Sequence, residues 1–151
     1  MSFQALRELP EEPPTLLVND VEVSPFMVDW RTGRVKQIAP AESIETVARL
    51  GSVGELQIEL ANSASPSGLT VGVYPDSVDR IDPTLPPPIT HDCVTEPSCT
   101  LENSADSVTA TLTDLFPQSP QAVFVVTATY FAESDGTPFA NTMVWVLEAS
   151  R

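Results

Sequence analysis

Basic residues are scarce in this chain of 151 residues. Seven lysines and arginines stand against 21 aspartates and glutamates, which gives a formal net charge of −14. We therefore expect no nucleic-acid partner, because phosphates would be repelled over most of the surface. The chain also lacks any run of 18 consecutive apolar residues, so the sequence predicts no membrane-spanning segment.

Groups that carry catalysis are equally scarce. Histidine occurs once, at His91, inside a proline-rich segment. The sequence contains no nucleophile elbow, phosphate-binding loop or dinucleotide fingerprint. We interpret His91 as an exposed loop residue and predict no catalytic residue, no enzyme activity and no cofactor. A weaker alternative is an enzyme that uses His91 together with nearby acids.

Glycine is also sparse, with six residues against 15 prolines, which favours strands and turns over long helices. Short runs rich in apolar, β-branched and aromatic residues recur along the chain and indicate strands. The predicted strands are Thr15–Val18, Val21–Val23, Phe26–Trp30, Val35–Ile38, Ile44–Leu50, Glu55–Leu60, Leu69–Tyr74 and Val108–Thr113, followed by a hairpin over Ala122–Leu147. The segment 41–50 also has partly helical spacing. The number of strands predicts an all-β fold, a two-sheet antiparallel sandwich of immunoglobulin-like type.

The strand runs begin at Thr15, and residues 1–14 are acidic and rich in proline. We expect residues 1–14 to form a flexible N-terminal tail or linker and residues 15–151 to form a single β-sandwich domain. Gly72 interrupts the outward face of its strand, where it leaves room for a close neighbour. The segment Pro75–Pro97 is predicted to be a long, extended connection without strands.

Cys93 and Cys99 are the only cysteines, and both lie in that connection. A disulfide between them would close a small loop and indicate an oxidising compartment. Two alternatives remain open at this point. One is a metal site that adds His91, although its spacing lacks the close cysteine pair of zinc sites. The other is two free thiols.

Four residues are candidates for a binding face. If Trp30 and Tyr74 were exposed beside Arg31 and Arg34, they would form an aromatic, basic surface for a ligand or an anionic partner. The competing interpretation places the aromatic residues in the core and the arginines on a solvated turn. A second candidate is a calcium site made by Asp76, Asp79 and Asp82, which competes with a solvated acidic loop. We predict no metal there.

Three segments resemble parts of small β-sandwich domains found in secreted proteins and cell-surface lipoproteins of Gram-positive bacteria, most of them without an assigned function. The first is Pro13–Val23, in which two apolar strands flank Asn19-Asp20. The second is Phe26–Trp30 followed by Arg31-Thr32-Gly33, and the third is the closing strand Thr142–Glu148. The resemblance implies a sandwich fold and a location outside the cytoplasm.

Together these features predict a non-catalytic, extracytoplasmic binding or interaction module whose partner is a protein or a small molecule. The alternative is a structural subunit of a surface assembly that makes protein–protein contacts through its proline-rich segments and strand edges. The oligomeric state and the identity of the partner are not encoded in any motif of the chain.

Overall fold

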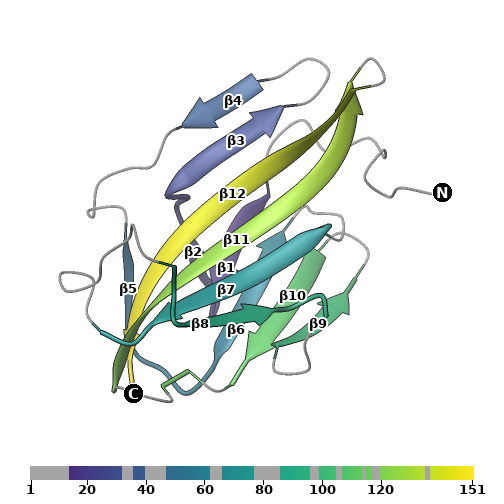
Figure 1. Cartoon of the computed structure of the whole chain (residues 1–151). Coiled ribbons are helices and arrows are strands. Elements are labelled where there is room, and N and C mark those ends of the chain that lie inside the picture. The colour runs from purple at the N-terminus through teal and green to yellow at the C-terminus, as the bar shows by residue number, and fades with distance from the viewer. Residues whose placement is uncertain are drawn as a thin grey trace.

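The computed structural model describes residues 14–31, 36–39, 47–61, 66–76, 86–95, 99–104, 107–113, 115–116, 120–134 and 137–151. Within these ranges every regular element is a strand, and the strands form two sheets packed face to face (Figure 1). The predicted all-β sandwich is therefore confirmed, whereas the immunoglobulin-like strand arrangement stays a prediction. Most of the predicted tail, residues 1–13, lies outside the described residues, and Pro14 is buried.

The first sheet has five strands in the order β2-β1-β6-β10-β9, and all its neighbours are antiparallel. Its strands are β2 (Val21–Val23), β1 (Thr15–Val18), β6 (Leu56–Ala61), β10 (Ser107–Leu112) and β9 (Cys99–Asn103). Along β6 the predicted alternation is confirmed. Leu56, Ile58 and Leu60 are fully buried, whereas Gln57 is exposed.

The second sheet has seven strands. Six of them follow the order β4-β3-β12-β11-β7-β8, and β5 pairs in parallel with the end of β12 that β3 does not cover. These strands are β4 (Lys36–Ala39), β3 (Met27–Arg31), β12 (Thr137–Ser150), β11 (Gln121–Ser134), β7 (Gly68–Tyr74), β8 (Ile89–Asp92) and β5 (Ala48–Ser52). The predicted strand over 44–50 is confirmed from Ala48 onward, and residues 44–46 lie outside the described residues.

The 14-residue strands β11 and β12 form the predicted hairpin and run as one long curved ribbon across the sheet (Figure 1). Because side chains alternate along a strand, the ribbon supplies apolar residues to both of its faces. Phe124 and Trp145 point into the core between the sheets, where Trp30 stacks edge-to-face on Tyr130 at a centroid distance of 5.3 Å. Burial of such aromatic side chains between the sheets contributes about 1.5–3 kcal/mol each.

The outer face of the seven-stranded sheet carries a second, smaller apolar cluster. Val123 and Val146 are buried there with Val47, and Tyr74 and Phe26 pack against them. The neighbouring Glu148 is only 8% exposed, and its Oε1 lies 2.6 Å from Nη1 of Arg49. This ion pair compensates the cost of holding a carboxylate in a largely apolar environment.

The segment Pro75–Pro97 contains an element that the sequence did not predict, since Ile89–Asp92 forms the edge strand β8. His91 is therefore not an exposed loop residue, and that interpretation is wrong. It lies opposite Val71 of β7, so its side chain shares the core-facing side of the sheet and is only 9% exposed. The short, polar sequence of β8 gives no alternation long enough to reveal it.

The predicted disulfide between Cys93 and Cys99 is present, but it lies beside two strands and not in the strand-free connection that we predicted. Cys93 directly follows β8 at one edge of the seven-stranded sheet, and Cys99 begins β9 at one edge of the five-stranded sheet. Both residues are almost fully buried. The bond therefore fixes the edges of the two sheets to each other at the point where the chain crosses between them. On the loop-entropy model it stabilises the fold by roughly 2 kcal/mol.

The predicted close neighbour of Gly72 is confirmed. A Cβ atom at Gly72 would lie 2.8 Å from Cγ of Pro87, so the segment Pro86–Pro88 approaches the outer face of the sheet closely at this position. Glycine is needed here because any larger side chain would displace that segment.

We predict that Gly72→Ala lowers the free energy of unfolding by about 1–3 kcal/mol, because the added methyl group clashes with Pro87. Gly68→Ala is the matched control, since a Cβ at Gly68 meets only Thr129 Cβ at an ordinary 3.9 Å. Urea unfolding of both variants measures the difference. Equal stabilities of the two variants would contradict the close approach.

Candidate functional site

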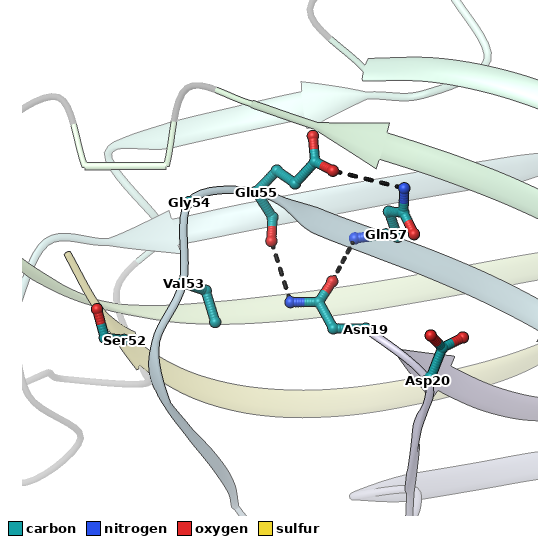
Figure 2. A pocket seen from close by; sticks show the side chains of 7 residues that line it. All are labelled: Asn19, Asp20, Ser52, Val53, Gly54, Glu55 and Gln57. Atoms are coloured by element: carbon teal, nitrogen blue, oxygen red, sulfur yellow. Dashed lines mark hydrogen bonds between the residues drawn. The ribbon is translucent and has the colours of Figure 1, made fainter.

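A hollow of about 570 Å³ opens at one end of the sandwich, where the chain crosses from the seven-stranded to the five-stranded sheet. One wall is the turn between β1 and β2, and the other is the connection from β5 to β6. Its lining residues are Asn19, Asp20, Ser52, Val53, Gly54, Glu55 and Gln57 (Figure 2). Six of these seven residues are polar or glycine, so the hollow offers hydrogen-bonding groups rather than an apolar floor.

Asn19 holds the two walls together. Its backbone N–H donates to the Gln57 carbonyl at 3.0 Å, and its Oδ1 accepts from the Gln57 N–H at 2.8 Å. Its Nδ2 donates to the Glu55 carbonyl at 3.1 Å, so the side chain bridges residues 55 and 57 (Figure 2). These three bonds position the β5–β6 connection against the β1–β2 turn.

The turn itself has an unusual backbone. Asn19 and Asp20 have φ values of 50° and 68°, which place both residues in the left-handed region. Asparagine and aspartate adopt this region more readily than other non-glycine residues, and two consecutive left-handed residues are typical of a tight two-residue hairpin turn. The dipeptide Asn19-Asp20 thus explains both the predicted turn and the shape of this side of the hollow.

The groups that face solvent in the hollow are two carboxylates, a hydroxyl and an amide. They belong to Asp20, Glu55, Ser52 and Gln57, all of which are exposed. The Gln57 Nε2 lies 3.4 Å from Glu55 Oε1, which orients that carboxylate along the rim. Carboxylates only accept hydrogen bonds when ionised, so this lining suits a ligand that donates them. Among the described residues, no lysine, arginine or histidine lines the hollow.

The structure does not bring the predicted binding residues together on one surface. Trp30 is 1% exposed in the core, so it is not available to a ligand. Tyr74 lies half-buried on the outer face of β7, which β11 and β12 separate from β3. Arg31 is the last residue of β3, and Arg34 lies outside the described residues. For the two aromatic residues the competing interpretation, packing in apolar clusters, describes their positions better.

Two metal sites were considered from the sequence, one at the cysteines and one for calcium. A site made by His91, Cys93 and Cys99 is wrong, because the disulfide leaves no thiolate to bind a metal. For calcium, Asp79 and Asp82 lie outside the described residues, whereas Asp76 follows β7 directly. Within the described ranges no three potential metal ligands cluster together.

No local sequence pattern predicts the hollow. In the sequence, Asn19-Asp20 is only the dipeptide between two predicted strands, and Glu55 is only the first residue of the predicted strand Glu55–Leu60. Their proximity depends on the pairing of β1 with β6, which no spacing between residues 19 and 55 reveals. The dipeptide Asn19-Asp20 is the one sequence feature that points to this end of the sandwich, because asparagine and aspartate favour tight turns.

Family models, curated proteins and solved structures were each compared with the chain, and none of the three comparisons gave a match. The described part of the chain contains no helix with the length and apolar character needed to cross a bilayer.

We predict that Asn19→Ala lowers the free energy of unfolding by about 1–2 kcal/mol, because it removes two side-chain hydrogen bonds and strains a left-handed residue. Asn19→Gly separates these causes, since glycine tolerates the backbone angle but also lacks the side chain. We expect a loss for Asn19→Gly that is smaller than for Asn19→Ala yet still measurable by thermal unfolding. A glycine variant as stable as the original protein would show that the bridging bonds contribute nothing.

Proposed function

We propose that this chain is a non-catalytic, extracytoplasmic binding module that holds a ligand rich in hydrogen-bond donors in the hollow between the β1–β2 turn and the β5–β6 connection. The observation that carries the proposal is that the two walls of the hollow are already joined by hydrogen bonds within the chain itself. Asn19 connects both walls through three hydrogen bonds, so the backbone segments that carry Asp20 and Glu55 are held in place before a ligand binds. Preorganisation of this kind favours binding because less conformational entropy is lost.

Reversible binding suits the lining better than catalysis does. Of the described residues that line the hollow, only Ser52 carries a hydroxyl, and no histidine or lysine among them could serve as its base. His91, the sole histidine of the chain, is buried on β8 at the edge of the seven-stranded sheet. An activated nucleophile requires a base within hydrogen-bonding reach, and no hydrogen bond joins Ser52 to another residue that lines the hollow (Figure 2).

The extracytoplasmic part of the proposal is supported by the disulfide. A buried bond that joins the edges of two sheets belongs to the architecture of the fold, and structural disulfides persist in oxidising compartments. Protein alkylated at the moment of isolation from its natural source should resist labelling until a reductant is added. Labelling of both cysteines before reduction, read by intact mass, would place the folded protein in a reducing compartment instead.

The ligand site is tested by nuclear magnetic resonance titration of the isotopically labelled chain with three probes. Maltose and spermidine are rich in donors, and acetate is the donor-poor control. We expect maltose or spermidine to shift the amide resonances of Asp20, Gly54 and Glu55, because these residues line the hollow, and we expect acetate to leave them unchanged.

Glu55→Gln should weaken that binding about five- to tenfold, because it removes one charged acceptor from the rim. Glu102→Gln is the matched control, since Glu102 is an exposed acid on β9, at the opposite edge of the same sheet from β2. Unshifted resonances with both donor-rich probes, or equal effects of the two substitutions, would refute the ligand site.

A second candidate function, a structural subunit of a surface assembly, is favoured by a separate feature of the molecule. The hairpin of β11 and β12 extends beyond both strands that flank it, and no described strand pairs with the outward backbone groups of this extension, which would suit pairing with another chain. This feature is independent of the hollow, because neither strand of the hairpin contributes a residue to the lining of the hollow.

A further inference from the structure

The distal part of the β11–β12 ribbon is paired only with itself among the described strands. β7 pairs with β11 up to Thr129, and β3 pairs with β12 from Thr142 onward. Beyond these points lie five cross-strand pairs, from Tyr130↔Asn141 to Ser134↔Thr137, which we call the hairpin arm. Figure 1 shows the ribbon continuing past the end of β7.

A two-stranded ribbon exposes hydrogen-bonding groups along both edges and is only marginally stable by itself in water. On the β11 edge, Ser67 ends the contact with β7. Its N–H donates to the Thr129 carbonyl at 2.8 Å, and its Oγ accepts from the Phe131 N–H at 3.2 Å. Because alternate residues direct their backbone groups to the same side, the Phe131 carbonyl and both backbone groups of Glu133 face this edge. No described strand pairs with them.

The β12 edge of the arm is less suited to pairing. The Val144 carbonyl of β12 accepts from the Phe26 N–H on the side that faces away from β11. Alternate residues direct their backbone groups to the same side, so the backbone groups of Pro138 and Ala140 also face away from β11. Proline has no N–H to donate, and its presence on an outward edge discourages the addition of another strand. The two edges of the arm therefore differ, and β11 offers the open one.

An apolar side chain lies beside the open edge. Phe131 is 50% exposed, and on the outer face of the arm it lies opposite the exposed Ala140. A strand that paired with the β11 edge would place its own side chains next to Phe131 and would bury part of that ring. Partly exposed aromatic residues of this kind are frequent anchors of protein–protein contacts.

The charge of the chain indicates which kind of strand fits. Residues 81–151 contain nine acidic residues and one basic residue, Arg151, and the arm itself contains two acids and no base. A second copy of this chain would bring the same negative charge to the edge and would be repelled. A segment with lysine or arginine at alternate positions would be attracted instead.

We propose that the open β11 edge of the hairpin arm receives an extended, basic segment of a partner protein by strand addition. Backbone hydrogen bonds to Phe131 and Glu133 would supply affinity, and contact with the Phe131 ring and the acidic surroundings would supply selectivity. This proposal goes beyond ligand binding in the hollow, because the arm and the hollow share no residue.

The experiment titrates the full, isotopically labelled chain with three short peptides and follows amide resonances. One peptide alternates lysine and valine, one alternates glutamate and valine, and one is the lysine–valine peptide with every backbone nitrogen methylated. We expect the lysine–valine peptide to shift Phe131–Ser134 and to protect the Glu133 amide from exchange, with an affinity that falls as salt rises. The acidic peptide lacks the positive charge, and the methylated peptide has no backbone N–H to donate, so we expect neither to bind there.

Three variants separate the contributions. Glu133→Pro removes the N–H at the open edge and leaves the pairing with β12 intact, because that N–H faces away from β12. It should weaken binding by roughly tenfold relative to Glu133→Gln, which removes the charge alone. Phe131→Ser should also weaken binding by roughly tenfold. Val21→Ser is the matched control, since Val21 is another exposed apolar residue but lies on β2 of the other sheet.

Several results would overturn the proposal. They are shifts of equal size with the acidic peptide, shifts located away from the arm, and equal affinities of the proline and glutamine variants at position 133. A dimer in light scattering that Phe131→Ser abolishes would also overturn it, because the occupant of the edge would then be a second copy of this chain.

Discussion

The alternation of side chains along β11 and β12 is the constraint on which the rest of the structure depends. It places Phe124 and Trp145 between the sheets, and it places Val123 and Val146 in the smaller cluster on the outer face. A register shift of one residue would exchange the two faces along the whole ribbon, so the buried residues fix the register on both sides at once. The neighbouring strands β7, β3 and β5 then take their positions from this ribbon.

The features on which the proposals rest lie at two crossings between the sheets and at the distal end of the ribbon. The chain crosses between the sheets at the β5–β6 connection, and there Asn19 bridges the crossing segment to a neighbouring turn and shapes the hollow. It crosses again after β8, and there the disulfide joins the two edges. The ribbon extends beyond the strands that flank it and forms the hairpin arm. The net charge of −14 disfavours acidic partners for this chain and favours neutral or basic ones.

Sequence patterns identified the parts of this fold that are governed by local periodicity. The strand Leu56–Ala61 alternates cleanly, the hairpin has apolar runs on both sides of a polar turn, and Gly72 stands where a bulkier residue would clash. Patterns failed where neighbours far along the chain decide the outcome. β8 and β9 are short edge strands with little apolar content, and only their pairing with β7 and β10 makes them strands. The hollow has no sequence pattern for the same reason, since it depends on the pairing of β1 with β6. Trp30 was a candidate for binding because no sequence feature distinguishes a buried tryptophan from an exposed one.

The central claim is that the ribbon holds its large aromatic residues between two closed layers. The chain has two tryptophans, Trp30 and Trp145, and both are 1% exposed in the core. The most direct measurement is their fluorescence in the native protein, together with its quenching by iodide. The account predicts emission at short wavelengths, which iodide barely quenches until the protein is unfolded. Emission at the wavelength of free tryptophan, quenched equally before and after unfolding, would contradict it.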